Sequence, residues 1–595
     1  MRYFKIIALL ALLFLGGACS QEDTPSYWKF SPTPPLGWNS WDLFGTTVTE
    51  KQIKEQADAM AEHLLPAGYK YLTVDIQWYE PNASGHYYNP NAVLTMDEFG
   101  RLTPALNRFP SAAGGEGFKP LADYVHSKGL KFGIHIMRGI PKQAVEKNTP
   151  VFGTKVNAGD IALTNSTCPW NPDMYGVDAT KPEGQEYYNS IIRMYADWGV
   201  DYIKVDDISR PYNDVQKAEI EAIRKAIDAT GRSILLSLSP GATPLEAGEH
   251  VMNNANLWRI TDDFWDSWGL LLGMFERVDA WTPYRGAGHF PDADMLPIGI
   301  IDFDRPTKFT KDEHYTLMSL WAIGRSPLIF GGDMTHLDAF TKEMLTNPEM
   351  LKVNQNSTNN RQISREQNLI VWAADIPKSN DKYVALFNAQ SKGDNIDLSY
   401  ADYASPVIAG NGSSQEVNVS VKGGKRLVLF VNDGGNGYDW DHVIWVDPVL
   451  HGTNGDLKLT ELEWIAASSG WGNAQVNLTC DGKPLVVDGQ PVTGIGTHAS
   501  SVIIYDLPEG YDSFSAKGVV TQNAGSVVFG VLVDEGLIDM PDENIVKVNF
   551  NDIGITGKAR VLDLWSHKEV GVFSEEFSRT LPQHGAGLYK VSPVK

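Results

Sequence analysis

Strand-like and helix-like segments alternate from about Pro34 to Asp333, and this alternation most constrains the fold of the chain. Between the apolar runs lie amphipathic stretches such as DVQKAEIEAIRKAIDATG, with apolar residues at helical spacing (Val215, Ile220, Ile223 and Ile227). The pattern predicts an α/β fold, and it favours a (β/α)8 TIM barrel over a doubly wound sheet. No G-x-G-x-x-G or G-K-[ST] loop follows any of these runs, which counts against a nucleotide-binding sheet.

After about residue 355 the pattern changes to short β-like segments separated by Gly, Asn and Asp turns, such as NLIVWAAD, KRLVLFVND and SVVFGVLVD. This spacing is typical of an all-β antiparallel sandwich. A chain of 595 residues is long enough for more than one domain. Its net charge of −23 argues against nucleic acid as a partner, because phosphate binding requires a basic face.

The N-terminus, MRYFKIIALLALLFLGGACSQED, indicates an export signal. Arg2 and Lys5 precede an apolar run that is too short to span a bilayer. Gly16 to Cys19 resembles a bacterial lipoprotein signal, so residues 1–19 are predicted to be a signal peptide and Cys19 the lipidated residue. We expect an exported lipoprotein in the periplasm or at the outer-membrane surface, held to the membrane only by this lipid. The alternative is an ordinary signal peptide with an incidental cysteine.

The segment VDYIKVDD places charged residues at the end of a predicted barrel strand. Side chains alternate along a strand, so Lys204 and Asp206 share one face while Ile203 and Val205 share the other. Charge inside a barrel is costly unless it is paired and lies at the open carboxyl end, where barrel enzymes carry their catalytic groups. A structural ion pair is the alternative.

Other strand ends carry charge in the same way. YLTVDIQW contains Asp75, LWRITDD contains Arg259 and Asp263, and PDADML contains Asp294. Several carboxylates at one barrel mouth fit glycoside hydrolysis, which needs one carboxylate as nucleophile or base and a second as acid. Clustered Asp and His could instead hold a divalent metal, but no H-x-H, H-E-x-x-H or D-x-D-x-D-G motif occurs. We therefore predict no metal and no cofactor.

Six motifs, PPLGWNSW, YLTVDIQW, LKFGIH, YIKVDD, WRITDDFWDSW and DADMLPIG, occur in the order found in the α-galactosidase family, glycoside hydrolase family 27. The resemblance implies that Asp206 is the nucleophile and Asp263 the general acid/base of a retaining reaction through a glycosyl-enzyme. Retention predicts the two carboxyl groups to be roughly 5–5.5 Å apart, or a little more. It further implies that four residues hold the sugar and that Asp294 lies at the edge of the pocket; the four are Trp38, Asp75, Lys204 and Arg259.

Departures from the family pattern bear on which sugar is bound. Ile76 follows Asp75 where α-galactosidases usually have a second aspartate, which makes the C4–C6 corner apolar. L-Arabinopyranose is galactose without the exocyclic CH2OH group, and GIHIMRGIP and SLSPGATP resemble the β-L-arabinopyranosidase branch. A sugar hydroxyl without its partner costs about 1–3 kcal/mol, up to about a hundredfold in preference. Alternatively, Ile76 turns outward into the barrel wall.

Three further departures concern His135, Ser239 and Cys168. His135 replaces a frequent tyrosine and either donates to a sugar hydroxyl or fills space. Ser239 and Ala242 replace larger residues on the C2 side, which keeps an N-acetylgalactosamine substrate open. The cysteine that often follows the nucleophile motif is absent, so Cys168 is expected to be a free thiol.

These patterns divide the chain into a barrel over 28–350, a discontinuous sandwich of 351–399 with 541–595, and an insertion at 400–540. The insertion resembles the NPCBM family of jelly-roll carbohydrate-binding modules, so it is a candidate for glycan contact. Its His498 and Trp471 could meet a glycan, but a turn-stabilising histidine and a core tryptophan are favoured.

The sequence therefore predicts a retaining exo-glycosidase that acts on terminal α-D-galactosyl or β-L-arabinopyranosyl residues of an oligo- or polysaccharide. An α-N-acetylgalactosaminidase, a transglycosylase and a catalytically inactive glycan-binding lipoprotein are the alternatives. Both candidate catalytic aspartates are present, which counts against the inactive form.

Overall fold

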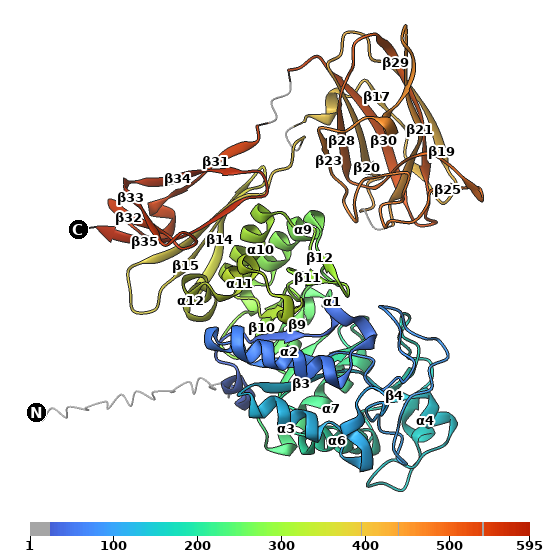
Figure 1. Ribbon diagram of the computed structural model, residues 1–595, viewed down its shortest axis with the longest axis vertical. Helices are drawn as coiled ribbons and strands as arrows, with labels where there is room; N and C mark the ends of the chain where they lie inside the picture. Colours follow the sequence, from blue (N-terminus) through green and yellow to red (C-terminus); the bar gives the residue numbers. More distant parts are fainter. Residues whose placement is uncertain (1–23, 394–395, 438–439, 538–540, 595) are drawn as a thin grey trace, which may run out of the picture.

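The chain folds into a barrel, a β-sandwich and an inserted β-domain, which follow one another along the long axis of the molecule (Figure 1). The computed structural model describes residues 24–393, 396–437, 440–537 and 541–594. Cys19 and the predicted signal peptide lie outside the described residues, so lipidation and export stay predictions. No helix in the described ranges combines the length and apolar character needed to cross a membrane.

Eight parallel strands form the barrel sheet, which confirms the predicted (β/α)8 class. In spatial order they are β10 (Phe290–Asp292), β9 (Leu257–Arg259), β8 (Leu235–Leu238), β7 (Tyr202–Asp206), β3 (Lys131–Met137), β2 (Tyr71–Val74), β1 (Leu36–Asn39) and β13 (Leu328–Phe330). A parallel bridge between Leu296 and Phe330 brings the two ends of the sheet together. The segment VDYIKVDD thus contains the fourth barrel strand, β7.

Helices pack around the barrel sheet, and side chains or glycines at their ends cap several of them. The main helices are α2 (Glu50–His63), α3 (Lys119–Ser127), α6 (Pro182–Asp197), α7 (Asp214–Thr230), α8 (Gly248–Met252), α9 (Trp268–Ala280), α10 (Lys311–Gly324), α11 (Ala339–Thr346) and α12 (Pro348–Asn356). Asn213 accepts a hydrogen bond at the start of α7, and Gly231 ends the helix with φ of 70°. Of the predicted apolar stripe on α7, Ile220, Ile223 and Ile227 are buried, whereas Val215 is partly exposed.

The predicted alternation along β7 is confirmed. Ile203 and Val205 pack in the core between sheet and helices, while Lys204 and Asp206 reach the cavity at the carboxyl end of the strand. Tyr202, at the start of the strand, belongs to a separate apolar layer with Tyr71, Leu235, Leu257 and the partly buried Phe30. The interior of the barrel is therefore apolar at the amino ends of the strands and charged at the carboxyl ends.

Between β3 and α6 the chain makes an excursion that carries Trp170. It contains β4 (Ile140–Pro141), α4 (Lys142–Glu146), α5 (Ala158–Ile161), β5 (Ala162–Leu163) and β6 (Met174–Val177). The three short strands form a small sheet in the order β4-β6-β5.

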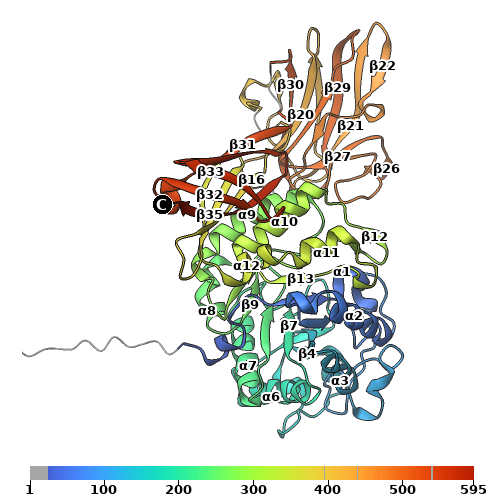
Figure 2. The ribbon, with the colours of Figure 1, turned by 60° about the vertical axis from the view of Figure 1, so that its left-hand side comes forward.

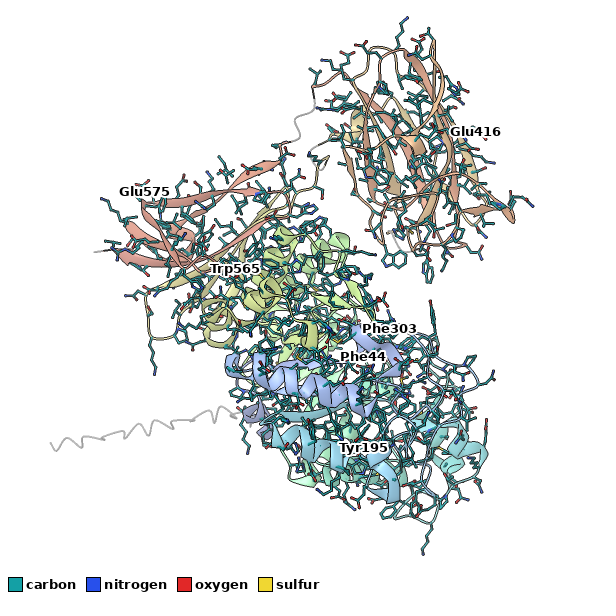
Figure 3. The ribbon with its side chains drawn as sticks, in the orientation of Figure 1. Phe44, Tyr195, Phe303, Glu416, Trp565 and Glu575 are labelled. Carbon is teal, nitrogen blue, oxygen red and sulfur yellow. The ribbon has the colours of Figure 1, made fainter. Side chains whose placement is uncertain are left out.

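The sandwich combines strands from both sides of the insertion. Its larger sheet runs β14 (Thr358–Glu366), β15 (Leu369–Asp375), β16 (Lys382–Asn388), β35 (Ala586–Val594), β32 (Lys558–Asp563) and β33 (Lys568–Ser574), and its smaller sheet pairs β31 (Glu543–Asn549) with β34 (Glu576–Pro582). The His584 ring stacks on Trp268 of α9 with centroids 3.6 Å apart, and the Trp565 indole, labelled in Figure 3, donates to Ser319 of α10. Aromatic contacts thus fix the sandwich to the barrel.

Two larger antiparallel sheets pack around the inserted domain's own core (Figure 2). One runs β17 (Tyr403–Ala404), β30 (Ser526–Asp534), β20 (Arg426–Asp433), β28 (Ser501–Asp506) and β23 (Ala466–Ala467). The other runs β19 (Ser414–Ser420), β29 (Tyr511–Val520), β21 (His442–Gly452), β27 (Gly494–His498) and β24 (Gln475–Val476). Trp445 is fully buried between them, so the predicted antiparallel β insertion is confirmed.

Candidate active site

A cavity of about 710 Å³ opens at the carboxyl ends of the barrel strands. Eight of the residues that the sequence singled out line it: Asp75, His135, Lys204, Asp206, Ser239, Arg259, Asp263 and Asp294. We call six of its charged or polar residues the floor: Asp75, His135, Lys204, Asp206, Arg259 and Asp294. We call five residues at its outer edge the rim: Arg210, Asp262, Asp263, Trp265 and Trp471.

Asp75 is the centre of a buried hydrogen-bond network in the floor. Its carboxylate accepts from the Asn39 amide at 2.8 Å, lies 2.7 Å from His135 Nδ1, and lies 3.4 Å from Lys204 Nζ. Burial opposes ionisation of Asp75, but the charges of His135 and Lys204 hold the pKa of its carboxyl group well below its usual range. Asp75 is therefore a fixed negative charge that orients the imidazole and the ammonium group.

Asp206 ends β7 and is almost fully buried. One carboxylate oxygen accepts from the backbone N–H of Asp207 at 2.7 Å, and the other lies 3.8 Å from His135 Nε2. Burial raises the pKa of Asp206, while the neighbouring charges of His135 and Lys204 lower it. Burial is the larger effect, so the pKa of Asp206 stands above its usual value, and the charges of His135 and Lys204 limit that rise.

Asp207, although adjacent to Asp206, faces away from the cavity. Its carboxylate lies 2.9 Å from Arg138 Nε, and the same guanidinium contacts Glu219 at 3.0 Å. Burial raises the pKa of Asp207 to about 7. The two neighbouring aspartates therefore have different surroundings, and Asp207 shapes the loop after β7.

Arg259 links the floor to the rim. Its guanidinium contacts Asp294 at 3.0 Å and Asp263 at 3.1 Å. Asp294 is buried and also accepts from the backbone N–H of Phe264 at 2.8 Å, whereas the Asp263 side chain is 61% exposed. Asp263 can therefore exchange protons with water while Arg259 holds it at the cavity.

Two predicted sugar contacts, Trp38 and Ile76, are fully buried and are not among the residues that line the cavity. The Trp38 indole donates to the carbonyl of Gly332 at 2.8 Å, beneath the cavity. Three residues later, at the start of the helix α1 (Trp41–Phe44), Trp41 lines the cavity instead. Ile76 belongs to the barrel core, which agrees with the alternative in which it turns into the wall.

The sequence did not single out Asp42, a buried residue that lines the cavity. Burial and the nearby charge of Asp294 raise the pKa of Asp42 well above its usual range. Its Oδ2 has no hydrogen-bond partner among the described residues. The signal lies in GWNSWD, where a carboxylate follows a strand end.

Of the rim residues, Asp263 was predicted, whereas Arg210, Asp262 and Trp265, on the loops after β7 and β9, were not. Arg210 pairs with Asp262, its guanidinium lies 5.5 Å from the Trp170 ring centroid, and Trp265 lies 5.5 Å from His86. Phe303, which contacts the His86 ring, lies on the side of the barrel nearest the inserted domain (Figure 3). Aromatic and charged groups thus surround the opening of the cavity.

The inserted domain contributes the outer wall through seven residues: Trp471, Gly472, Asn473, Gln475, Cys480, Asp481 and Gly482. The expectation that Trp471 is a core residue is wrong, because it is 41% exposed and lines the cavity. His498 is buried, and its Nδ1 lies 2.6 Å from the carbonyl of Ala499, as expected for a structural histidine.

One group of potential metal ligands occurs in the described ranges: His442, Cys480 and Asp481, whose ligand atoms lie within 4.8 Å of one another. Cys480 Sγ is 3.1 Å from His442 Nδ1, and Asp481 pairs with Lys483 at 2.7 Å. These atoms already contact protein partners. Cys168 and Cys480 are both buried free thiols, which confirms the expectation for Cys168.

Family comparisons match all three parts of the chain. Residues 33–145 and 173–356 match the family described as alpha galactosidase A. Residues 393–451 and 455–552 match the NPCBM/NEW2 domain, and residues 521–591 match the alpha galactosidase C-terminal beta sandwich domain.

Individual relatives support the same family assignment. An alpha-galactosidase from Coffea arabica is 32% identical over 387 residues, which cover 63% of this chain and 84% of the relative. The chain belongs to the α-galactosidase family. An alpha-N-acetylgalactosaminidase from Gallus gallus is 29% identical over 343 residues, covering 54% and 70% of the two chains.

A solved structure of a glycoside hydrolase family 27 β-L-arabinopyranosidase from Geobacillus stearothermophilus, in complex with arabinose, is also similar. Its TM-score is 0.70 at 37% identity, covering 96% of this chain and 100% of that one. Family membership and these relatives make the protein a glycosidase with a carbohydrate substrate.

Proposed function

We propose that the protein is a retaining exo-glycosidase that removes terminal β-L-arabinopyranosyl or α-D-galactosyl residues. The observation that carries this proposal is that Asp206 and Asp263 line one cavity, with Lys204 and Arg259 beside them. The apolar layer of Tyr202 and its neighbours fills the barrel beneath, so the cavity accepts the end of a glycan rather than its middle.

In the first step, the Asp206 carboxylate attacks the anomeric carbon while Asp263 donates a proton to the departing glycosidic oxygen. The charges of His135 and Lys204 oppose the rise in the pKa of Asp206 that burial causes. In the second step, Asp263 takes a proton from water, which displaces the sugar from Asp206 with net retention. The exposure of Asp263 suits this exchange, because its proton must leave and return in every cycle.

Two observations support a preference for β-L-arabinopyranose. The similar structure from Geobacillus stearothermophilus is a β-L-arabinopyranosidase, and it is 37% identical to this chain. Ile76 follows Asp75 where α-galactosidases usually have a second carboxylate, so one hydrogen-bonding group is absent behind the floor. Arabinopyranose lacks the CH2OH group that such a carboxylate would help to hold.

An α-N-acetylgalactosaminidase is the second candidate. Ser239 lines the cavity and is small, which leaves room for a 2-acetamido group. The relative from Gallus gallus carries that activity in its name. The p-nitrophenyl glycosides of the three sugars would separate these candidates.

The test of the reaction is turnover of p-nitrophenyl β-L-arabinopyranoside and p-nitrophenyl α-galactoside by the purified protein and by Asp206→Asn. We expect retention of anomeric configuration by NMR and a loss of about a thousandfold or more in the variant. Asp207→Asn is the matched comparison, because that carboxylate faces Arg138 and its loss should cost much less turnover. No turnover of either glycoside, or undiminished turnover by Asp206→Asn, would refute the proposal.

Export and lipidation also stand as proposals. Labelled palmitate should enter the full-length protein in bacterial cells, and Cys19→Ser should abolish that incorporation. Equal labelling of both forms would contradict anchoring through Cys19.

A further inference from the structure

The outer wall of the catalytic cavity is supplied by a different domain from the one that carries the candidate catalytic residues. Seven residues of the inserted domain line the same cavity as Asp206 and Asp263. Its volume of about 710 Å³ is that of a site for a drug-sized ligand, and one pyranose ring would not fill it. The space beyond the terminal sugar therefore lies against the inserted domain.

The loop that carries Trp471 rests on the barrel. A Cβ atom placed on Gly269, at the start of α9, would lie 3.1 Å from the carbonyl oxygen of Ser469. Ser469 in turn donates its hydroxyl to the carbonyl of Trp471 at 2.7 Å. The position of Trp471 over the cavity is thus set by direct contact between the two domains.

Trp471 is held in place on both sides. A Cβ on Gly470 would lie 2.2 Å from the carbonyl oxygen of Ala499, and one on Gly472 would lie 2.2 Å from that of Cys480. Gly472 also has φ of 62°, so both glycines permit a close backbone approach. The indole ring packs against the His442 ring with centroids 5.1 Å apart. A fixed, 41% exposed tryptophan is a contact surface that loses little entropy on binding.

The chemistry of the reaction places the leaving group on this side. Asp263 must reach the glycosidic oxygen, and its side chain lies at the exposed rim rather than in the floor. With the terminal sugar on the floor residues, the leaving sugar extends outward past Asp263 toward the rim, where Trp265 of the barrel and Trp471 of the inserted domain line the cavity. Sugar rings present C–H faces that pack on aromatic rings, and neither ring requires a charged ligand.

We propose that the loop 469–482 of the inserted domain forms the leaving-group subsite of the catalytic cavity, with the Trp471 indole as the platform for a neutral sugar ring. This proposal rests on the glycosidase mechanism proposed above. It assigns the insertion a part in the reaction itself rather than a separate glycan-binding role.

The test compares substrates that share a terminal galactose but differ in the leaving group. α-Galactosyl fluoride has no leaving sugar, whereas melibiose, a galactose joined to glucose, has one. Trp471→Ala should lower kcat/KM about tenfold for melibiose and leave it within about twofold for the fluoride, since an aromatic contact of this kind is worth about that factor. Trp471→Phe, which keeps a ring, should recover most of the melibiose rate. Tyr400→Ala is the matched control: Tyr400 is a 77% exposed aromatic residue of the insertion outside the cavity lining.

A second readout uses the same fluoride with methyl glucoside as acceptor. The acceptor hydroxyl displaces galactose from Asp206 in place of water and gives its proton to Asp263, so it must occupy the leaving-group subsite. Trp471→Ala should lower the ratio of transfer to hydrolysis by about tenfold, which a general loss of structure would not do.

Equal losses on melibiose and the fluoride, or no loss on either, would overturn the subsite while leaving the proposed reaction intact. Failure of the wild-type protein to turn over both compounds and p-nitrophenyl β-L-arabinopyranoside as well would instead overturn the proposed reaction, and failure on the two galactosyl compounds alone would overturn the subsite as proposed for galactosides.

Discussion

The floor of the cavity holds charged groups that are almost fully buried, whereas the rim holds charged and aromatic groups that water reaches. In the floor, Lys204 and Arg259 are 8% and 2% exposed, and each has a carboxylate partner. At the rim, the side chains of Arg210 and Asp262 are 46% and 62% exposed. Buried ion pairs fix one geometry, while exposed pairs rearrange at little cost. The difference suggests a floor that recognises one sugar and a rim that accommodates what is attached to it.

The largest expected effect is the loss of the proton donor Asp263 at the rim, and its size should depend on the leaving group of the substrate. Asp263→Asn removes the proton donor, so kcat/KM for melibiose should fall by about 10²–10⁴-fold. The same variant should lose far less on p-nitrophenyl α-galactoside, because p-nitrophenolate leaves without a proton. Steady-state kinetics on both substrates measure this difference. Equal losses would indicate that Asp263 does not act as the acid.

The next prediction concerns the stability of the floor. Lys204→Met leaves the buried Asp75 carboxylate without one of its cations, and breaking a buried pair costs about 3–5 kcal/mol. We expect a clear fall in the thermal unfolding midpoint by calorimetry. Lys225→Met, which breaks an exposed pair with Glu221, is the matched control and should change it little. Similar shifts for both variants would remove the distinction between buried and exposed charge.

A smaller effect is expected on the preference between galactose and arabinopyranose. Ile76→Asp restores the carboxylate usual in α-galactosidases, so the rate ratio of galactoside to arabinopyranoside should rise by up to about a hundredfold. Ile76→Val, a conservative change at the same buried site, should leave the ratio unchanged. The ratio of the kcat/KM values measured separately on the two p-nitrophenyl glycosides gives it. An unchanged ratio in the Asp variant would mean that Ile76 acts only as part of the barrel wall.

The smallest predicted effect is on the pH dependence of folding stability, to which Asp292 at the end of β10 contributes. Burial and the charge of Asp294 raise the pKa of Asp292 from 3.8 to about 6. The folded state therefore binds the proton more tightly, so this residue's contribution to stability falls as pH rises from about 4 to about 6. Asp292→Asn should flatten that part of the profile, as measured by unfolding midpoints at pH 4.5 and 7. An identical slope in the variant would contradict the shift.

The floor could be predicted from the sequence because strand periodicity is local. Alternation along VDYIKVDD was enough to bring Lys204 and Asp206 to the cavity, and the other charged strand ends followed the same rule. Trp38 and Trp41 show the limit of that reasoning. Trp38 lies in β1 and Trp41 begins the first helix, α1, so the turn between them decides which of the two faces the cavity. The position of Trp471 depends on how two domains dock, which no local pattern encodes.

The insertion leaves the sandwich after β16 and returns to it at β31, so it is tethered to the same body at both ends. A module on a single terminal linker samples many orientations, and its effective concentration at any one site is correspondingly low. Two attachment points exclude most of those orientations before any substrate arrives. The discontinuous sandwich thus restricts the orientations of the inserted domain, and the same domain attached only at the C-terminus would not be confined to its place as the outer wall of the cavity.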